Sequence, residues 1–348
     1  MLLSCKIEPE VAVLFEFDSD QRMWQDTVRT VLAKECPPSL VRAVITDGVD
    51  AAGLWRIYTD LGWTELTAQT EGVELAIALE ELGRATDPTP YLATMTQFAA
   101  FAPGFAQPGQ SGSTVFDGVS ARRDGDGWLL EGTAAHVLDG DRADWLAVVT
   151  PEGVFAVPGA SVSEQVSAVR TPVFDPVLHI AEVSFAQLRV SESDRSPADP
   201  ELARQLALTG MALTMVGACQ RILDLTVEHV RTRRQFGVLI GSFQAVQHKV
   251  VDIYIAVERA RALAYYAMIM ISTDDPRRRV AAAMAKAAAG ECQAVAFRNG
   301  YQLFGAMGYT WENDLQFALK RAKAGELLLG SAAEHRALIA KESHAAYL

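Results

Sequence analysis

The sequence predicts an α+β chain of three parts: an N-terminal helical domain, a small middle β-barrel or sandwich, and a C-terminal four-helix bundle. Apolar residues recur at helical spacing in both outer parts, whereas the middle part has short β-like runs separated by Gly- and Asp-rich turns. With 348 residues, of which 50% are hydrophobic and 21% charged, the chain is long enough for two or three domains. We place these domains at 1–91, 92–195 and 196–348.

The N-terminal part is predicted to contain two clear helices. Residues 18–20 (Asp-Ser-Asp) offer an N-cap ahead of apolar residues at helical spacing. A second run, residues 72–83, has the same period and stops at a glycine. The sequence Asp-Pro-Thr-Pro at 87–90 then closes the segment, because its prolines cannot continue a helix.

The middle part changes to a period typical of strands. Residues 102–113 are rich in Gly, Pro and Ser and are predicted to be a loop. Turn signals follow at 124–127 (Asp-Gly-Asp-Gly) and 139–141 (Asp-Gly-Asp). Strands are predicted at 128–130, 145–149, 154–157, 179–185 and 187–190, and their spacing favours a small barrel or sandwich.

The C-terminal part is predicted to be an antiparallel bundle of four helices, each roughly 25–35 residues long. The first begins at Asp199–Pro200 and runs to about Thr232, and the second is capped by Ser242. The third opens at Asp275–Pro276 and ends near Gly305. The fourth is capped by Thr310.

Composition excludes several function classes. A net charge of −12 and a pI near 5.0 argue against nucleic acid as a partner. The longest uncharged stretch, 205–220, is too short for a membrane helix, and the first residues do not resemble a signal peptide. The six histidines show no metal-ligand spacing, so no metal site is expected. Scattered cysteines indicate a reducing, cytoplasmic setting: Cys5, Cys36, Cys219 and Cys292.

An anion-binding segment is predicted where the first two bundle helices meet, in RTRRQFGVLIGSFQAVQ, residues 231–247. Free amides at the start of the second helix, together with Arg233, form an anion site, and Phe236 and Phe243 add flat apolar surface. The alternative is that arginines at a helix C-terminus only complement the helix dipole. His229 and His248 are interpreted as helix-surface groups.

A second candidate segment is YQLFGAMGYTWEND, residues 301–314. Its glycines at Gly305 and Gly308 let the backbone approach a ligand closely at a sharp turn between helices. The alternative interpretation is a plain helical hairpin.

These two segments together resemble the acyl-CoA dehydrogenase family, whose last domain carries RxxFG…FQ followed by QxxGxxGYT…E. The middle stretch RRDGDGWLLEGTAAHVLDGDRADWLAVV is similar to that family's β-domain, and GWTEL…EGVELAIALEELGRATDPTP is similar to its N-terminal helical segment. The resemblance covers nearly the whole chain. It implies FAD as cofactor, an acyl-CoA substrate and electron-transfer flavoprotein as acceptor.

The resemblance also assigns cofactor-binding residues to an FAD that lies between subunits. The family usually has Gly-Gly where this chain has Gly305–Ala306. The resemblance implies that Arg233 pairs with the pyrophosphate. Phe236, Ile240 and Phe243 would pack on the adenosine half, and Gln244 would form a hydrogen bond to it. Gln302 and the backbone at Gly305 and Ala306 would contact an adjoining FAD.

The positions that the family uses for chemistry lack the expected residues. The glutamate base corresponds to Leu329, or, in a minority of the family, to Ala207. The Trp and Thr beside the flavin ring correspond to His136 and Leu138. No catalytic residue is therefore assigned in this chain.

This pattern resembles the non-catalytic subunits of heteromeric (α₂β₂) actinobacterial dehydrogenases that act on steroid-CoA thioesters. The resemblance implies a homologous partner subunit that carries the catalytic Glu. Two alternatives remain: a self-sufficient homo-oligomeric enzyme with a relocated base, for which Glu326 is the nearest candidate, or a non-enzymatic scaffold on the same fold.

Overall fold

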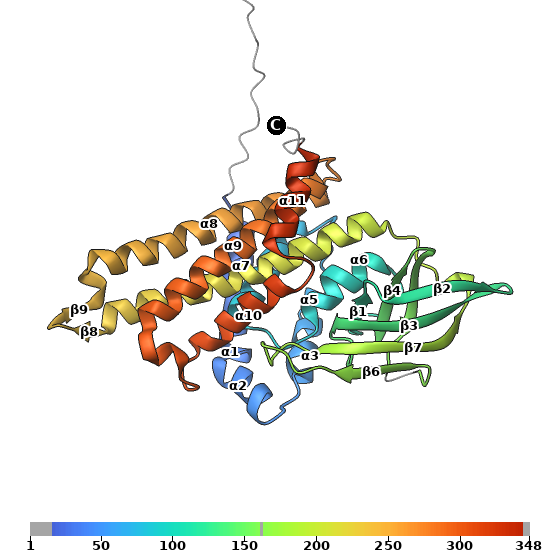
Figure 1. Cartoon of the computed structure of the whole chain (residues 1–348), viewed down its shortest axis with the longest axis horizontal. Coiled ribbons are helices and arrows are strands. Elements are labelled where there is room, and N and C mark those ends of the chain that lie inside the picture. Colours follow the sequence, from blue (N-terminus) through green and yellow to red (C-terminus); the bar gives the residue numbers. More distant parts are fainter. Residues whose placement is uncertain (1–15, 161–162, 344–348) are drawn as a thin grey trace, which may run out of the picture.

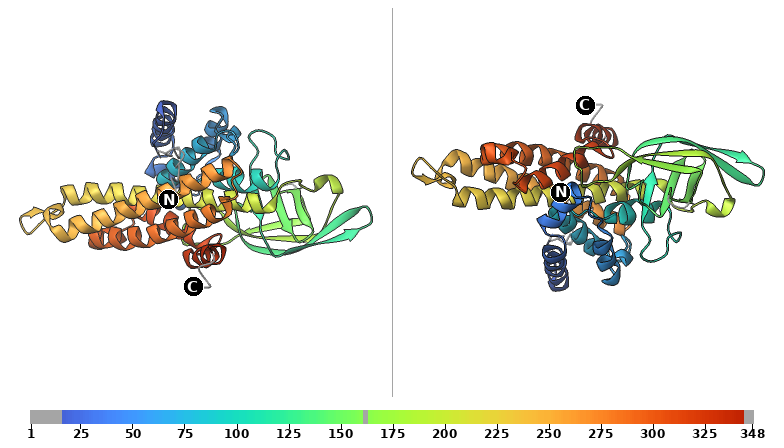
Figure 2. Two further views of the ribbon diagram at one scale, coloured as in Figure 1. Left: turned by 90° about the horizontal axis from the view of Figure 1, so that it is seen from above. Right: turned by 90° about the horizontal axis from the view of Figure 1, so that it is seen from below.

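The computed structural model describes residues 16–160 and 163–343. Cys5 and the first residues, which were not expected to form a signal peptide, therefore lie outside the described residues. A long helical bundle forms the body of the molecule, and the β-domain extends from one end of it (Figure 1). The N-terminal helices lie on one side of the bundle, and the last helix lies on the opposite side (Figure 2).

The N-terminal part is helical, as predicted, and contains more helices than the sequence signals indicated. The Asp18 side chain caps the first helix by accepting from the amides of Asp20 and Gln21 at 2.9 and 2.8 Å. The helices are α1 (Ser19–Glu35), α2 (Pro38–Thr46), α3 (Ala52–Asp60), α4 (Gly72–Ala85), α5 (Tyr91–Ala93) and α6 (Ala99–Phe101), with a 3₁₀ turn at Trp63–Glu65 and a π-helical turn at Thr94–Phe98.

Two packed sheets form the middle part, which is a sandwich. One sheet has the order β1-β4-β5, with β1 and β4 parallel, and the other has the antiparallel order β2-β3-β7-β6. Side chains from both sheets share one core, including Leu146 and Phe155 from the first and Leu130 and Val183 from the second. The strands are β1 (Gly112–Val115), β2 (Val119–Asp124), β3 (Gly127–Leu138), β4 (Trp145–Thr150), β5 (Gly153–Pro158), β6 (Val166–Arg170) and β7 (Ile180–Val190).

Several strand predictions are confirmed and others need correction. The predicted strands at 145–149 and 154–157 match β4 and β5, and the turn at 124–127 joins β2 to β3 as a two-residue hairpin. The strands predicted at 179–185 and 187–190 are one strand, β7, with an irregularity at Gln187 (φ 53°). The stretch predicted to be a loop ends in β1. Strands β2 and β6 were not predicted, because each is too short to show a clear alternation of apolar and polar residues.

The bundle contains three long helices, and the fourth is broken. The turn between Leu327 and Ala332 divides the last segment, so the prediction of a fourth continuous helix of roughly 25–35 residues is wrong. Leu329 and Gly330 in this turn have φ of 58° and 92°, which no α-helix can contain. The bundle helices are α7 (Pro200–Thr232), α8 (Gln244–Ser272), α9 (Arg278–Phe304), α10 (Leu315–Leu327) and α11 (Ala332–Glu342).

Two predicted caps are also wrong. The Ser242 hydroxyl donates to the Leu239 carbonyl, and the N-terminus of α8 has no side-chain cap. The Thr310 hydroxyl donates to the Met307 carbonyl, and α10 begins only at Leu315. In both places a 3₁₀ turn precedes the helix and takes up the hydroxyl that the sequence offered as a cap.

Helix α7 is the central element of the molecule. By length and composition it could cross a membrane, but nearly all of its apolar window is buried among the other helices, as in the core helix of a soluble protein. Helix α4 packs so closely on α7 that a Cβ placed on Gly217 would lie 1.8 Å from the Glu80 carbonyl oxygen. The N-terminal part is therefore anchored directly on the bundle.

Buried polar groups join the three parts. The Arg321 guanidinium on α10 lies 2.8 Å from the Asp175 carboxylate of the β-domain and donates to the Asp87 carbonyl after α4 at 3.0 Å. The Asp87 carboxylate accepts in turn from the hydroxyls of Tyr58 and Thr89. Burial raises the pKa of Asp87 to about 6.

Candidate functional site

The segment predicted to bind an anion forms a small hairpin at the end of the bundle that lies farthest from the β-domain (Figure 1). Helix α7 ends at Thr232, and strands β8 (Arg234–Gln235) and β9 (Val238–Leu239) follow. Phe236 and Gly237 make the turn with φ of 54° and 82°, the backbone that a two-residue hairpin of this kind requires. The amide of Ile240 donates to the Arg233 carbonyl at 2.9 Å and closes the loop onto α7.

The hairpin presents its predicted binding residues outward. Arg233 and Gln244 are exposed and Ile240 is half-buried. The Phe236 side chain is 91% exposed, and its ring meets that of Phe243 edge-on with 6.2 Å between centroids. Among the described residues this aromatic surface is open, and it lies beside helix amides that no side chain caps. Such a surface suits a ligand or partner that packs against it.

The second predicted segment lies at the C-terminus of α9. Gln302, Gly305 and Ala306 are all exposed. Gly305 has φ 58° and ψ −140°, a conformation open essentially to glycine alone, and a Cβ placed there would meet no atom within 4 Å. The backbone is therefore accessible from outside at this turn.

His229 brings the two segments to the same end of the bundle. Its ring stacks on that of Phe304 with 4.2 Å between centroids, which ties the end of α7 to the end of α9. Partial burial and the nearby positive charge of Arg233 lower the pKa of His229, so its ring is neutral at pH 7. His248, by contrast, is an exposed helix residue, as predicted.

The position assigned to the glutamate base is Leu329, which has no carboxylate and lies in a turn held by hydrogen bonds. Two side chains hold the carbonyls of Leu329 and Gly330: His335 Nε2 lies 2.9 Å from the first oxygen, and Lys286 Nζ donates to the second at 2.7 Å. The alternative base position, Ala207, is fully buried near the N-terminal end of α7. Sequence reasoning missed this clamp, for which the only signal is a lysine within an Ala-rich helix.

Glu326, the candidate for a relocated base, is partly buried at the end of α10. Its side chain is 15% exposed, and its Oε1 accepts from the Ala332 amide at 3.0 Å, at the N-terminus of α11. Its Oε2 lies 4.0 Å from Lys286 Nζ, which is fully buried. Burial lowers the pKa of Lys286 to about 8.

The two positions assigned to the flavin ring do not form a ring site together. His136 is exposed and has φ 60°, whereas Leu138 is 5% exposed and belongs to the core between the domains. The cavity lined by Leu138 measures about 20 Å³, enough for a water molecule but not for a flavin ring. The guanidinium, aromatic and amide groups at the exposed end of the bundle are of the kinds that an adenosine and a pyrophosphate require, whereas the two residues assigned to the flavin ring differ, one being exposed and the other part of the core.

Comparison with known proteins identifies the family. A family model described as "Acyl-CoA dehydrogenase, C-terminal domain" matches residues 207–344. Acyl-CoA dehydrogenase IpdE2 of Mycobacterium tuberculosis is 32% identical over 326 residues, which cover 90% of this chain and 94% of that protein. The chain belongs to the acyl-CoA dehydrogenase family. Its members are FAD-dependent flavoproteins.

Solved structures have the same fold. The ChsE4-ChsE5 complex from Mycobacterium tuberculosis contains a chain that matches with a TM-score of 0.85 at 23% identity, over 95% of this chain and 98% of that one. A chain of the Tcur3481-Tcur3483 steroid acyl-CoA dehydrogenase (G363A variant) matches with a TM-score of 0.83 at 24% identity, over 94% and 99%. Butyryl-CoA dehydrogenase from Megasphaera elsdenii matches with a TM-score of 0.85 at 18% identity, over 94% and 99%.

Proposed function

We propose that this chain is the non-catalytic subunit of a heteromeric acyl-CoA dehydrogenase. It contributes to a shared FAD site, and a homologous partner subunit supplies the catalytic Glu and the flavin-ring site. The observation that carries this proposal is Leu329, an aliphatic residue at the base position in a turn held by Lys286 and His335. A general base contributes about 10²–10⁴ to a rate, so its absence leaves this chain alone a poor dehydrogenase.

The exposed end of the bundle would hold one half of the cofactor. Arg233 would pair with the pyrophosphate, the rings of Phe236 and Phe243 together with Ile240 would pack on the adenosine half, and Gln244 would donate a hydrogen bond. Gln302 and the backbone at Gly305 and Ala306 would meet an adjoining FAD. Bound FAD supplies the hydride acceptor for α,β-dehydrogenation of an acyl-CoA. All of these groups except the half-buried Ile240 are exposed, which supports a site completed by another chain.

Two solved relatives support the partner and substrate class. One is a complex of two differently named chains, and the other is a two-component steroid enzyme. We infer by analogy an α₂β₂ cytoplasmic assembly that acts on a bulky, steroid-derived CoA thioester and passes electrons to electron-transfer flavoprotein.

The proposal is tested by the visible absorption spectrum of the chain purified alone and co-expressed with a homologous subunit that carries the glutamate. We expect flavin bands only in the complex, at one FAD for every two chains. Arg233→Ala should remove the flavin from the complex, because the pyrophosphate loses its guanidinium partner.

Arg56→Ala, an exposed arginine on α3, serves as the matched control and should keep the flavin. Retention of FAD by the Arg233→Ala complex would contradict the site assignment. Absence of flavin from every co-purified complex would favour a scaffold role instead.

A self-sufficient enzyme is the second candidate, because Glu326 Oε2 is buried without a hydrogen-bond partner among the described residues, in the last turn of α10 and three residues before Leu329. Its other oxygen is held by the Ala332 amide, which favours a structural role. Acyl-CoA turnover by the isolated chain, abolished in Glu326→Gln, would establish this candidate and exclude the first.

A further inference from the structure

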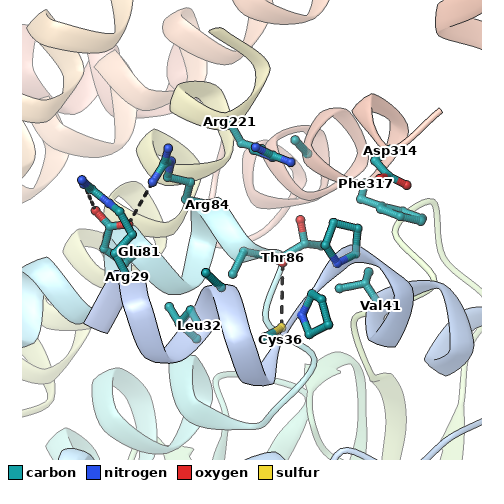
Figure 3. Close-up of a pocket in the computed structure, with 15 residues that line it drawn as sticks. Arg29, Leu32, Cys36, Val41, Glu81, Arg84, Thr86, Arg221, Asp314 and Phe317 are labelled. Carbon is teal, nitrogen blue, oxygen red and sulfur yellow. Dashed lines mark hydrogen bonds and ion pairs between the residues drawn. The ribbon is translucent and has the colours of Figure 1, made fainter. Parts of the chain in front are cut away.

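A pocket of about 380 Å³ lies outside the predicted FAD site, between the N-terminal helices and the bundle. Helices α1, α2 and α4 form one side, and α7 and α10 form the other (Figure 3). Its volume is within the range of small-molecule sites. Apolar side chains form much of its lining, among them Leu32, Pro37, Val41 and Phe317.

Most charged side chains around this pocket are paired with one another or with neighbours. Arg29 pairs with Glu81 at 2.6 Å, and Arg84 pairs with Asp224 at 2.7 Å. Asp314 is bound by Arg42, which lies outside the pocket, at 2.7 Å.

Arg221 is the remaining cation. Within residues 16–160 and 163–343 its guanidinium makes no hydrogen bond or ion pair. Its side chain is half-buried, and it extends from α7 along the pocket toward the side of Asp314 and Phe317 (Figure 3). A half-buried guanidinium without a protein partner is costly unless an anion or water meets it.

We propose that this pocket binds a small carboxylate with an apolar body, and that Arg221 pairs with the carboxylate. The lining includes three arginines and two carboxylates, so its one net positive charge matches a monoanion. The planar guanidinium fork fits a carboxylate in a bidentate manner. The apolar body packs on Leu32, Val41 and Phe317. This binding does not depend on FAD or on the partner subunit.

Calorimetric titration of the full chain with octanoate, without flavin, tests the proposal. We expect saturable one-to-one binding, at least tenfold weaker binding in Arg221→Gln, and unchanged binding in the Arg56→Gln control, because a charge-assisted bidentate pair contributes on this scale. Ala33→Trp should block the pocket and weaken binding by a similar factor. Ala33 is exposed at the rim, so this variant leaves the core intact.

Octan-1-ol and octyl phosphate distinguish the ligand class. Octan-1-ol should bind at least tenfold more weakly than octanoate, and octyl phosphate should bind no tighter than octanoate. The proposal is overturned if octanoate does not saturate, if Arg221→Gln and Ala33→Trp bind it as the wild type does, or if either probe binds better. None of these outcomes depends on the shared-FAD proposal.

Discussion

Lys286 illustrates how much one buried residue contributes to this fold. It lies on α9, has no exposed surface and donates to the Gly330 carbonyl in the turn that breaks the last bundle segment. Together with His335 it satisfies two carbonyls that an unbroken helix would have satisfied internally. The left-handed backbone at Leu329 and Gly330 is thus held by side chains from two other helices.

The lowered pKa of Lys286 gives stability a specific pH dependence. Between about 8 and the ordinary lysine value of 10.5, the unfolded chain holds a proton that the folded chain has released. Stability therefore rises with pH in this window, by up to about 1.4 kcal/mol per pH unit. We expect the free energy of unfolding of the wild type, measured in urea, to rise across this window relative to Lys286→Met.

Lys341→Met, at an exposed position in α11, is the control and should follow the wild type. If Lys286→Met and the wild type keep a constant difference from pH 7 to 10.5, the lysine is not perturbed as described.

At the scale of elements, glycines allow α4 and α7 to pack very closely. A Cβ on Gly217 would lie 1.8 Å from the Glu80 carbonyl oxygen, and one on Gly83 would lie 2.1 Å from that of Thr214. Neither contact can be relieved by a side-chain rotation, because both atoms belong to the backbone of the facing helix. The two helices would have to move apart.

We therefore expect Gly217→Ala to destabilise the protein by about 1–3 kcal/mol or more through overpacking. Gly53→Ala in α3 is the matched control, since a Cβ there meets no atom within 4 Å. It should stabilise the protein by about 0.4–1 kcal/mol, because alanine reduces the entropy of the unfolded chain. Thermal unfolding of the two variants measures both effects, and equal shifts would contradict the close packing.

The whole molecule depends on a junction where its three parts meet. Arg321 from the bundle contacts Asp175 of the β-domain and the Asp87 carbonyl of the N-terminal part, and the paired side chains are 7% and 1% exposed. Removing one member of such a pair leaves the other charge buried and unpaired.

Asp175→Ala should therefore cost about 3–5 kcal/mol in the free energy of unfolding. The double variant Arg321→Met/Asp175→Ala should be more stable than the single variant, because it removes the unpaired guanidinium. Urea unfolding of the two variants tests this. A double variant that is less stable than Asp175→Ala would show that Arg321 acts mainly through its bond to Asp87.

The sequence by itself determined the order of helix, strand and helix, the extents of the three long bundle helices, and the absence of a carboxylate at Leu329 and Ala207. The first two features follow from periodicity and capping residues, which are local along the chain. The third rests on the resemblance to the acyl-CoA dehydrogenase family, which marks these two positions as those of the base. Short elements such as α2, β1 and β6 carry too few residues to show a period.

Only the tertiary structure decided which groups meet across the fold. It places Glu326 against α11 and Lys286 and joins Arg321 to Asp175. It also puts Arg221 in a pocket where no other described residue pairs with its guanidinium. It also turns Ser242 and Thr310 away from the caps that their positions suggested. Each of these outcomes depends on contacts between residues far apart in the chain or on a backbone turn imposed by packing, and neither follows from local residue patterns.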